Sequence, residues 1–244
     1  MRFRFSLPAT LLLLTLAAAF AWLGSWQWQR MGEKERLIAE FEAAPELEYS
    51  AATRDREGYS RVALYGRFQS DWHVLRDNRI ERGRPGVEVF SLFLPDHGPG
   101  LLVNRGWLPL PADRRSLPAV PTPDGRVRIS GLLAPPPEPG VRLGEAVFPE
   151  NPKGPILMTY FDFQQISDRM EDGLHDAVLL LDAADPSGFG ARAWEPTVMR
   201  PGQHRAYAVQ WFALAATAVI IWLLLGYRRT RARDSHTSDN GGLA

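Results

Sequence analysis

Two long runs of uncharged, mostly apolar residues, one near each end of the chain, constrain this sequence more than any other feature. The first covers residues 5–28 and the second covers residues 206–227. Each run is long enough for a helix to cross a hydrocarbon core, which takes roughly 20 residues. We therefore expect two transmembrane helices, with residues 29–205 between them forming a domain outside the bilayer.

Arginines lie beside both apolar runs, on what we expect to be the same side of the membrane. Arg2 and Arg4 precede the first run, and four arginines within residues 228–233 follow the second. Basic residues beside an apolar segment tend to remain in the cytoplasm. We therefore expect residues 1–4 and the basic tail, residues 228–244, to be cytoplasmic, and the domain between the runs to be exported.

Other interpretations of the two runs stay open. The first run could be a cleaved signal peptide, since it follows a basic start and contains a candidate cleavage site at Ala19-Phe20-Ala21. However, the run continues to Trp22, Trp26 and Trp28, whose indole rings favour a membrane interface. The second run could be the buried helix of a soluble protein, which the arginines behind it disfavour.

Small residues on each run offer a surface for close helix packing. In lipid no strong hydrophobic force drives helices together, so pairing depends on such surfaces. The same residues could equally be filler that faces lipid. They are Ala17, Ala18, Ala21 and Gly24 on the first run, and Ala208, Ala215, Ala216 and Ala218 on the second.

Composition excludes several classes of function. Lys plus Arg and Asp plus Glu number 28 each, so we expect no nucleic-acid partner, which would need a strongly basic face. The chain has no Cys, which excludes disulfides, thiolate metal sites and Cys nucleophiles. No residues assemble an acid, a base and a nucleophile, so we expect a protein that is not an enzyme.

The segment between the runs reads as a β-rich domain. Residues 33–48 favour helix, so the first helix should continue outward until Pro45 ends it, and from Gly58 the apolar period changes to two. Short strands between Gly and Pro turns, with a helix at residues 162–171, predict a small antiparallel barrel or sandwich with one or two short helices. The expected strands are residues 61–68, 72–76, 87–94, 101–107, 126–133, 155–160, 177–181 and 194–199.

Two weak patterns have plain explanations. Residues 188–193 loosely fit a GxGxxA nucleotide-binding pattern, but no helix is expected to open there, so a turn is favoured. Asp71 and His73 alternate onto one strand face and could ligate a metal ion, but they lack a third ligand.

Two other residues are candidate sites by position. Arg105 follows the apolar strand at residues 101–103, and His204 lies just before the second run, at its outer end. A titratable residue at a membrane boundary is a candidate site by default. Plainer roles stay open: Arg105 could be solvated or ion-paired, and His204 could hydrogen-bond water or a helix end.

Five short stretches together carry a family resemblance. In their order and topology they resemble the surfeit-locus-1 (Surf-1/Shy1-type) family of cytochrome c oxidase assembly factors. The likeness covers nearly the whole chain, although we recognise no family motif between Pro109 and Pro149. The stretches are residues 23–30 (LGSWQWQR) with Glu33 and Lys34, residues 66–68 (GRF), 102–109 (LVNRGWLP), 149–152 (PENP) and 204–212 (HRAYAVQWF).

The resemblance implies a two-span protein of the bacterial inner membrane whose central domain faces the periplasm. It implies binding of haem a and insertion of this cofactor into the large catalytic subunit of the oxidase, with haem a synthase as a further candidate partner. The carried-over haem position is the His before the second span, here His204. Haem a suits this place, because its apolar tail belongs in lipid, its propionates belong at the surface, and neutral imidazole ligates haem iron.

The residues after His204 extend this expectation. Helical spacing puts His204, Tyr207 and Trp211 on one face with Ala208 and Ala215. We expect His204 to ligate the iron, the two aromatic residues to pack on the macrocycle, and the alanines to leave room for it. The alternative is that this stripe only packs against the first helix and that His204 is solvated.

Arg105 is the fourth expected cofactor-binding residue. Its guanidinium could clamp a carboxylate in a bidentate way, a role that Arg79 or Arg82 could equally fill. Two rival functions for the whole chain stay open as well. One is a cofactor-free membrane chaperone that stabilises the nascent oxidase subunit, and the other is an unrelated envelope sensor or enzyme.

Overall fold

The chain forms two compact units in the computed structural model. Residues 6–50, 58–111, 116–138, 154–170, 173–190, 192–196 and 199–238 are described, with side chains up to residue 227 in the last range. One unit, here called the helix pair, combines Met1–Ala39 with Pro196–Ala244. The other unit, here called the barrel, comprises Glu40–Glu195.

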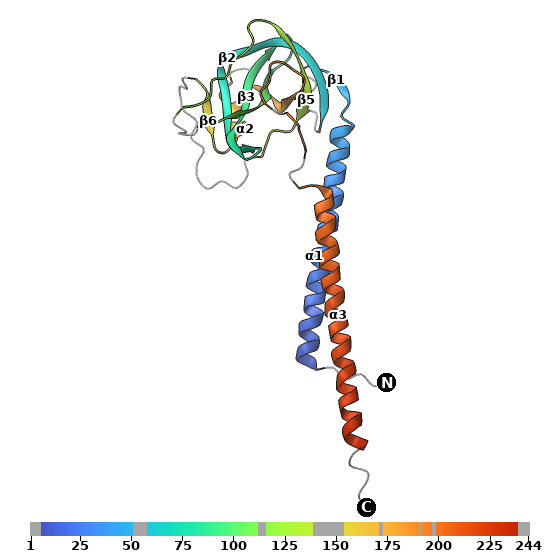
Figure 1. The fold of residues 1–244 in the computed structure, drawn as a ribbon. Helices are drawn as coiled ribbons and strands as arrows, with labels where there is room; N and C mark the ends of the chain where they lie inside the picture. Colours follow the sequence, from blue (N-terminus) through green and yellow to red (C-terminus); the bar gives the residue numbers. More distant parts are fainter. Residues whose placement is uncertain are drawn as a thin grey trace, which may run out of the picture. The chain divides into compact units, whose positions relative to one another are not determined.

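The helix pair contains the two long helices of Figure 1, α1 (Leu7–Glu42) and α3 (Pro201–Ser238). Helix α1 and the segment Pro201–Tyr227 of α3 are long and apolar enough to cross a membrane. Helix α1 continues past its apolar run and ends shortly before Pro45, because the residue preceding a proline disfavours helical geometry. The predicted fold class, two candidate spans flanking a β-rich domain, is confirmed.

The described residues of the barrel form seven strands and one short helix. Figure 1 labels several of them. Helix α2 spans Phe163–Ser167, and the Asp162 carboxylate caps it by accepting a hydrogen bond from the backbone N–H of Gln165. The strands are β1 (Glu46–Glu48), β2 (Ser60–Glu81), β3 (Arg84–Pro95), β4 (Gly100–Pro109), β5 (Val127–Ala134), β6 (Ile156–Met158) and β7 (Leu174–Leu181).

Five of these strands close into a ring in the order β2-β3-β4-β7-β5, because β5 pairs back onto β2. Within the ring only the β4–β7 pair is parallel. This order with one parallel pair is that of the five-stranded Greek-key barrel called the OB-fold, an architecture that by itself assigns no function. Strands β1 and β6 add to β2 in parallel.

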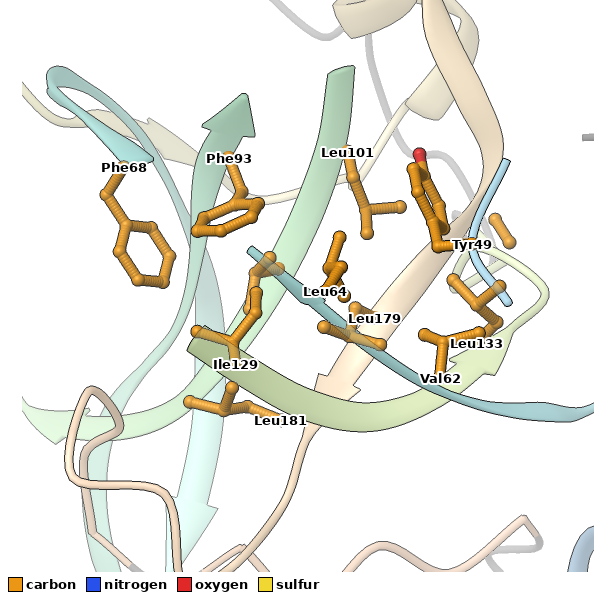
Figure 2. Close-up of a cluster of buried hydrophobic side chains, with 12 residues drawn as sticks. Tyr49, Val62, Leu64, Phe68, Phe93, Leu101, Ile129, Leu133, Leu179 and Leu181 are labelled. Carbon is orange, nitrogen blue, oxygen red and sulfur yellow. The ribbon is translucent and has the colours of Figure 1, made fainter. Parts of the chain in front are cut away.

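The barrel interior is filled by alternate residues of the ring strands. In β2 the buried positions from Ser60 to Phe68 alternate with exposed ones, as a strand with one face on a core requires. Figure 2 shows side chains from several strands converging on this interior. The cluster comprises Tyr49, Val62, Leu64, Phe68, Phe93, Leu101, Val103, Ile129, Leu133, Ala177, Leu179 and Leu181.

A second apolar layer buries the outer face of β3. Phe90 and Leu92 pack there with residues of β6 and α2, including Met158 and Ile166. Strand β3 is therefore buried on both faces, which explains why its sequence reads as an almost continuous apolar run. The outer surface of β3 is therefore covered by β6 and α2.

The strands differ from the expected ones in three places. Residues 61–68 and 72–76 belong to one long strand, β2, whose register shifts let it pair with β5 in its first half and β6 in its second. The predicted strand at residues 194–199 is wrong for the described residues 194–196, and the three-residue strand β1 was not expected. Pairing is mixed rather than wholly antiparallel, since β1 and β6 pair with β2 in parallel and β7 pairs with β4 in parallel.

Candidate functional site

His204 lies in the first turn of α3, which Pro201 opens, a favoured place for proline because its missing N–H has no helical partner there. The side chain is only 7% exposed. Its Nδ1 atom lies 2.7 Å from Oε1 of Gln27 on α1. An amide oxygen accepts and cannot donate, so the hydrogen of this bond belongs to Nδ1 of the imidazole.

The other ring nitrogen of His204 has a different environment. Nε2 is buried and has no hydrogen-bond partner among the described residues. Since Nδ1 carries the hydrogen, Nε2 of the neutral ring carries a free lone pair. A buried polar atom without a partner is costly and is uncommon in native proteins, so it needs an explanation.

The seam between α1 and α3 runs from His204 along one stripe of α3. Its positions recur every three or four residues, which keeps them on one helix face. Trp211 stacks on Phe20 with ring centroids 5.7 Å apart, and Trp222 Nε1 donates to Thr10 Oγ1 at 3.1 Å. As residue numbers rise along α3 they fall along α1, so the helices are antiparallel. The buried or half-buried positions of the stripe are His204, Ala208, Trp211, Ala215, Ala218, Trp222 and Gly226.

This seam brings together some of the predicted site residues and separates others. His204 and Trp211 lie on it, whereas Tyr207 is 47% exposed on the side of α3. Ala208 is fully buried. The stripe is therefore packed, as in the alternative in which it only packs against the first helix. His204 is not solvated, however, which that alternative had assumed.

Gln27 was not singled out from the sequence. It belongs to the seam of α1, three residues after the buried Gly24. The signal that could have identified it is an amide inside the apolar run near its end, because His204 stands at the matching end of the other run. Gly24 leaves room for the ring of Phe212, which would lie 2.8 Å from an added Cβ.

Arg105 belongs to the barrel, not to the helix pair, and is 2% exposed. Its Nε donates to the carbonyl of Ser187 at 2.7 Å and its Nη2 to the carbonyl of Pro121 at 2.8 Å. The guanidinium lies between the rings of Phe68 and Phe189, at 4.7 and 4.4 Å from their centroids. These contacts engage the Nε–H and one N–H of Nη2 and enclose the guanidinium.

No described carboxylate forms an ion pair with Arg105. Burial lowers the pKa of Arg105 to about 10, against the raising effect of Asp185. The side chain thus works as a buried cation held by carbonyl oxygens and aromatic faces. Its expected role in cofactor binding stays a prediction, and its contacts favour a role in barrel stability.

The rest of the Asn-Arg-Gly-Trp segment also serves the barrel. The Asn104 amide donates to Glu88 at 2.9 Å and its oxygen accepts from the backbone N–H of Gly106 at 3.1 Å. Gly106 has φ +102°, and a Cβ there would meet the carbonyl oxygen of Phe189. Trp107 Nε1 donates to the carbonyl of Arg79.

The alternative arginines have partners or lie in solvent. Arg79 approaches the Glu88 carboxylate with an Nε–Oε2 distance of 3.5 Å, and Arg82, whose side chain is 85% exposed, pairs weakly with Glu81.

Asp71 and His73 do not form a metal site. A register shift between Phe68 and His73 separates the two residues, leaving Asp71 exposed and His73 buried. Within the described ranges no group of three or more His, Asp or Glu side chains could hold a metal ion. The described residues of the GxGxxA stretch, 188–190 and 192–193, form no helix and one isolated bridge, between Gly106 and Phe189, as expected for a turn.

Known proteins resemble this chain along most of its length. The sequence model of the SURF1 family matches residues 14–216. A SURF1-like protein of Monosiga brevicollis is 30% identical over 83% of this chain and 82% of its own length. A SURF1-like protein of Rickettsia felis is 24% identical, covering 85% and 91%, and Surfeit locus protein 1 of Xenopus tropicalis is 26% identical, covering 87% and 73%.

Proposed function

The chain belongs to the SURF1 family, and on that premise we propose that it is an inner-membrane assembly factor that binds haem a through His204 and aids its insertion into the large subunit of cytochrome c oxidase. Family membership supports the role in oxidase assembly in general. The observation that carries the finer proposal is the buried Nε2 atom of His204, which has no partner among the described residues.

The residues around His204 fit a haem ligand. Imidazole nitrogen is a common axial ligand of haem iron, and a ligating histidine usually gives its other N–H to a hydrogen-bond acceptor. Gln27 Oε1 is that acceptor here. Haem bound at this atom would supply the iron whose coordination satisfies the lone pair. Exposed Tyr207 and half-buried Trp211 flank the same stretch of α3 and offer apolar surface to a macrocycle.

Burial of Nε2 fits a protein that binds haem a and then releases it. Iron can reach this atom only when the side chains covering it move, because the atom is inaccessible in the packed helix pair. Part of the binding energy is spent on that movement, which limits the affinity. A weakly held cofactor suits transfer to the oxidase subunit, and haem a synthase is a candidate donor.

We further propose that both termini are cytoplasmic and that the barrel is periplasmic. The arginines beside each span support this orientation. A reporter active only in the periplasm should give a signal when fused near Ala112 and none when fused at the C-terminus. Signal at the C-terminus, or a mature protein beginning near Trp22, would contradict the two-span topology.

His204→Ala tests the haem proposal directly. The full-length protein is purified in detergent from cells that make haem a, and its absorption spectrum is compared with that of the wild type. We expect the variant to insert and fold normally but to lose the haem spectrum. His97→Ala is the matched control, because His97 is exposed in a loop of the barrel and should leave the spectrum unchanged.

A cofactor-free chaperone is the second candidate function. The packed seam favours it, because Trp211 and Ala208 already have protein neighbours that account for their positions. If His204→Ala keeps a normal haem a content and an unshifted spectrum, His204 is not the ligand. The protein would then be assigned to stabilising the nascent subunit without the cofactor.

A further inference from the structure

Gln27 and His204 form a polar contact in the mostly apolar seam, far along it from the hydrogen bond of Trp222 to Thr10. The two residues are 177 positions apart in the sequence, and their side chains meet at 2.7 Å. On either side of Gln27 the indoles of Trp26 and Trp28 are exposed, so helical periodicity turns the amide toward α3 and the indoles away from it. A hydrogen bond in such a setting is stronger than in water, because little solvent competes for it.

This contact decides which nitrogen of His204 carries the hydrogen. A neutral imidazole has two tautomers, with the hydrogen on Nδ1 or on Nε2. Only the Nδ1–H form can donate to the oxygen of Gln27, and only that form leaves a lone pair on the buried Nε2. Without an acceptor at position 27 the hydrogen can occupy Nε2, and the nitrogen that faces the ligand then has nothing to donate to a metal.

We propose that Gln27 is a positioning residue that holds His204 in the Nδ1–H tautomer and so presents the Nε2 lone pair to iron. The tautomer part rests on the geometry of the helix pair alone, and the iron part rests on the proposed function. Gln27 touches the histidine rather than the ligand, so it acts through the orientation and basicity of the ring.

Nitrogen NMR of the cofactor-free protein tests the tautomer part. Full-length wild type, Gln27→Leu, Gln27→Glu and Gln29→Leu are labelled with ¹⁵N-histidine in lipid nanodiscs, and the His204 signals are identified by their absence from His204→Ala. We expect Nδ1 protonated and Nε2 unprotonated in the wild type and in Gln27→Glu, whose carboxylate also accepts. Gln27→Leu should shift the hydrogen to Nε2 wholly or in part, whereas Gln29→Leu, an exposed amide on the same helix, should change nothing.

Haem a binding by the same four proteins tests the iron part. We expect Gln27→Leu to lose roughly 10–100-fold in affinity, as is usual for partners that orient a metal ligand. Gln27→Glu should bind and lower the reduction potential of the bound haem, because a carboxylate makes the ring a stronger donor. A purely structural Gln27 would not move the potential.

Each outcome separates the two proposals. A wild type with the hydrogen on Nε2, or a Gln27→Leu variant with an unchanged tautomer, overturns the role of Gln27 whether or not haem binds. A changed tautomer with unchanged haem affinity also overturns it. A wild type that shows the expected tautomer but binds no haem a overturns the proposed function and leaves the positioning of His204 by Gln27 standing.

Discussion

The barrel and the helix pair each bury a histidine, and the two differ in how their ring nitrogens are used. In the barrel, His73 Nε2 donates to the carbonyl of Ser70 and Nδ1 accepts from the hydroxyl of Ser91, both at 2.9 Å. In the helix pair, His204 uses Nδ1 for Gln27 and leaves Nε2 without a partner among the described residues. Burial alone therefore does not distinguish a structural histidine from a candidate ligand, but the unused lone pair does.

The same contrast extends to Arg105 in the barrel. Two carbonyl oxygens, a hydroxyl and two aromatic rings surround its guanidinium. A buried polar group with all its neighbours in place stabilises a fold, whereas a buried polar group with an unmet bond is poised for a partner. In the barrel His73 and Arg105 thus have protein partners, whereas in the helix pair Nε2 of His204 has none among the described residues.

The largest loss of stability should come from Arg105→Ala, because this variant removes a buried barrel side chain that has several partners. Loss of the large buried side chain leaves a cavity and unpaired carbonyl oxygens at Ser187 and Pro121. We expect the free energy of unfolding to fall by about 3–5 kcal/mol. Thermal unfolding followed by circular dichroism measures it, and the oxidase haem content should fall together with the amount of this protein.

Arg67→Ala is the matched control for Arg105, because Arg67 is an exposed arginine of β2. Its replacement should change the free energy of unfolding by less than about 0.5 kcal/mol. Arg105→Ala could instead accumulate and unfold like the wild type while the haem content of the oxidase falls. That result would support the hypothesis that Arg105 clamps a carboxylate, and the stability role would be wrong.

A smaller effect is expected from Gly24→Leu in the helix pair. An added side chain meets the ring of Phe212, whose nearest atom lies 2.8 Å from the Cβ position. We expect the seam to lose about 1–2 kcal/mol of stability, read as earlier unfolding in an SDS titration. Gly32→Leu on the same helix meets nothing within 4 Å and should be neutral or slightly stabilising. Equal behaviour of the two variants would show that α1 and α3 do not pack through Gly24.

The smallest effect should be the contribution of His73 to the pH dependence of the stability of the barrel. Burial, with Arg105 adding to it, lowers the pKa of His73, against the raising effects of the Ser70 carbonyl and Asp71. The unfolded chain therefore takes up this proton first as pH falls. Stability is fully present above the ordinary histidine pKa of about 6.5 and declines below it, toward the lowered folded value.

His73→Gln checks this dependence, because it removes the titrating group. The loss of unfolding free energy between about pH 7.5 and about pH 5.5 should be smaller than in the wild type. The exposed His97, changed to Gln, should leave the wild-type dependence intact. An unchanged slope in His73→Gln would mean that the ring is not protonated on unfolding.

Much of the fold could be predicted because its signals are local. Length without charge identifies a candidate span, and alternation identifies a strand such as β2 from Ser60 to Phe68. Strand β1 could not be found, since three residues are too few to show a period. The parallel pairing of β4 with β7 also lay beyond prediction, because it joins segments that are far apart in the chain.

The candidate site also combines features that the local sequence predicts with features that it does not. His204 could be identified from its place at the end of an apolar run, a property of neighbouring residues only. Tyr207 and Trp211 were assigned to one face, but their four-residue spacing leaves them about 40° apart around a helix axis, enough for one to be exposed and the other to join the seam.

By itself the sequence determined the two candidate spans, the β-rich character of the domain between them and the candidacy of His204. Each follows from composition or periodicity over a few consecutive residues, which short-range physical chemistry sets. Only the tertiary structure decided that Gln27 meets His204, that Nε2 is left without a described partner and that Arg105 is enclosed by Ser187, Pro121 and two aromatic rings. Those facts depend on which distant segments come into contact, and burial and hydrogen-bond satisfaction exist only after they do.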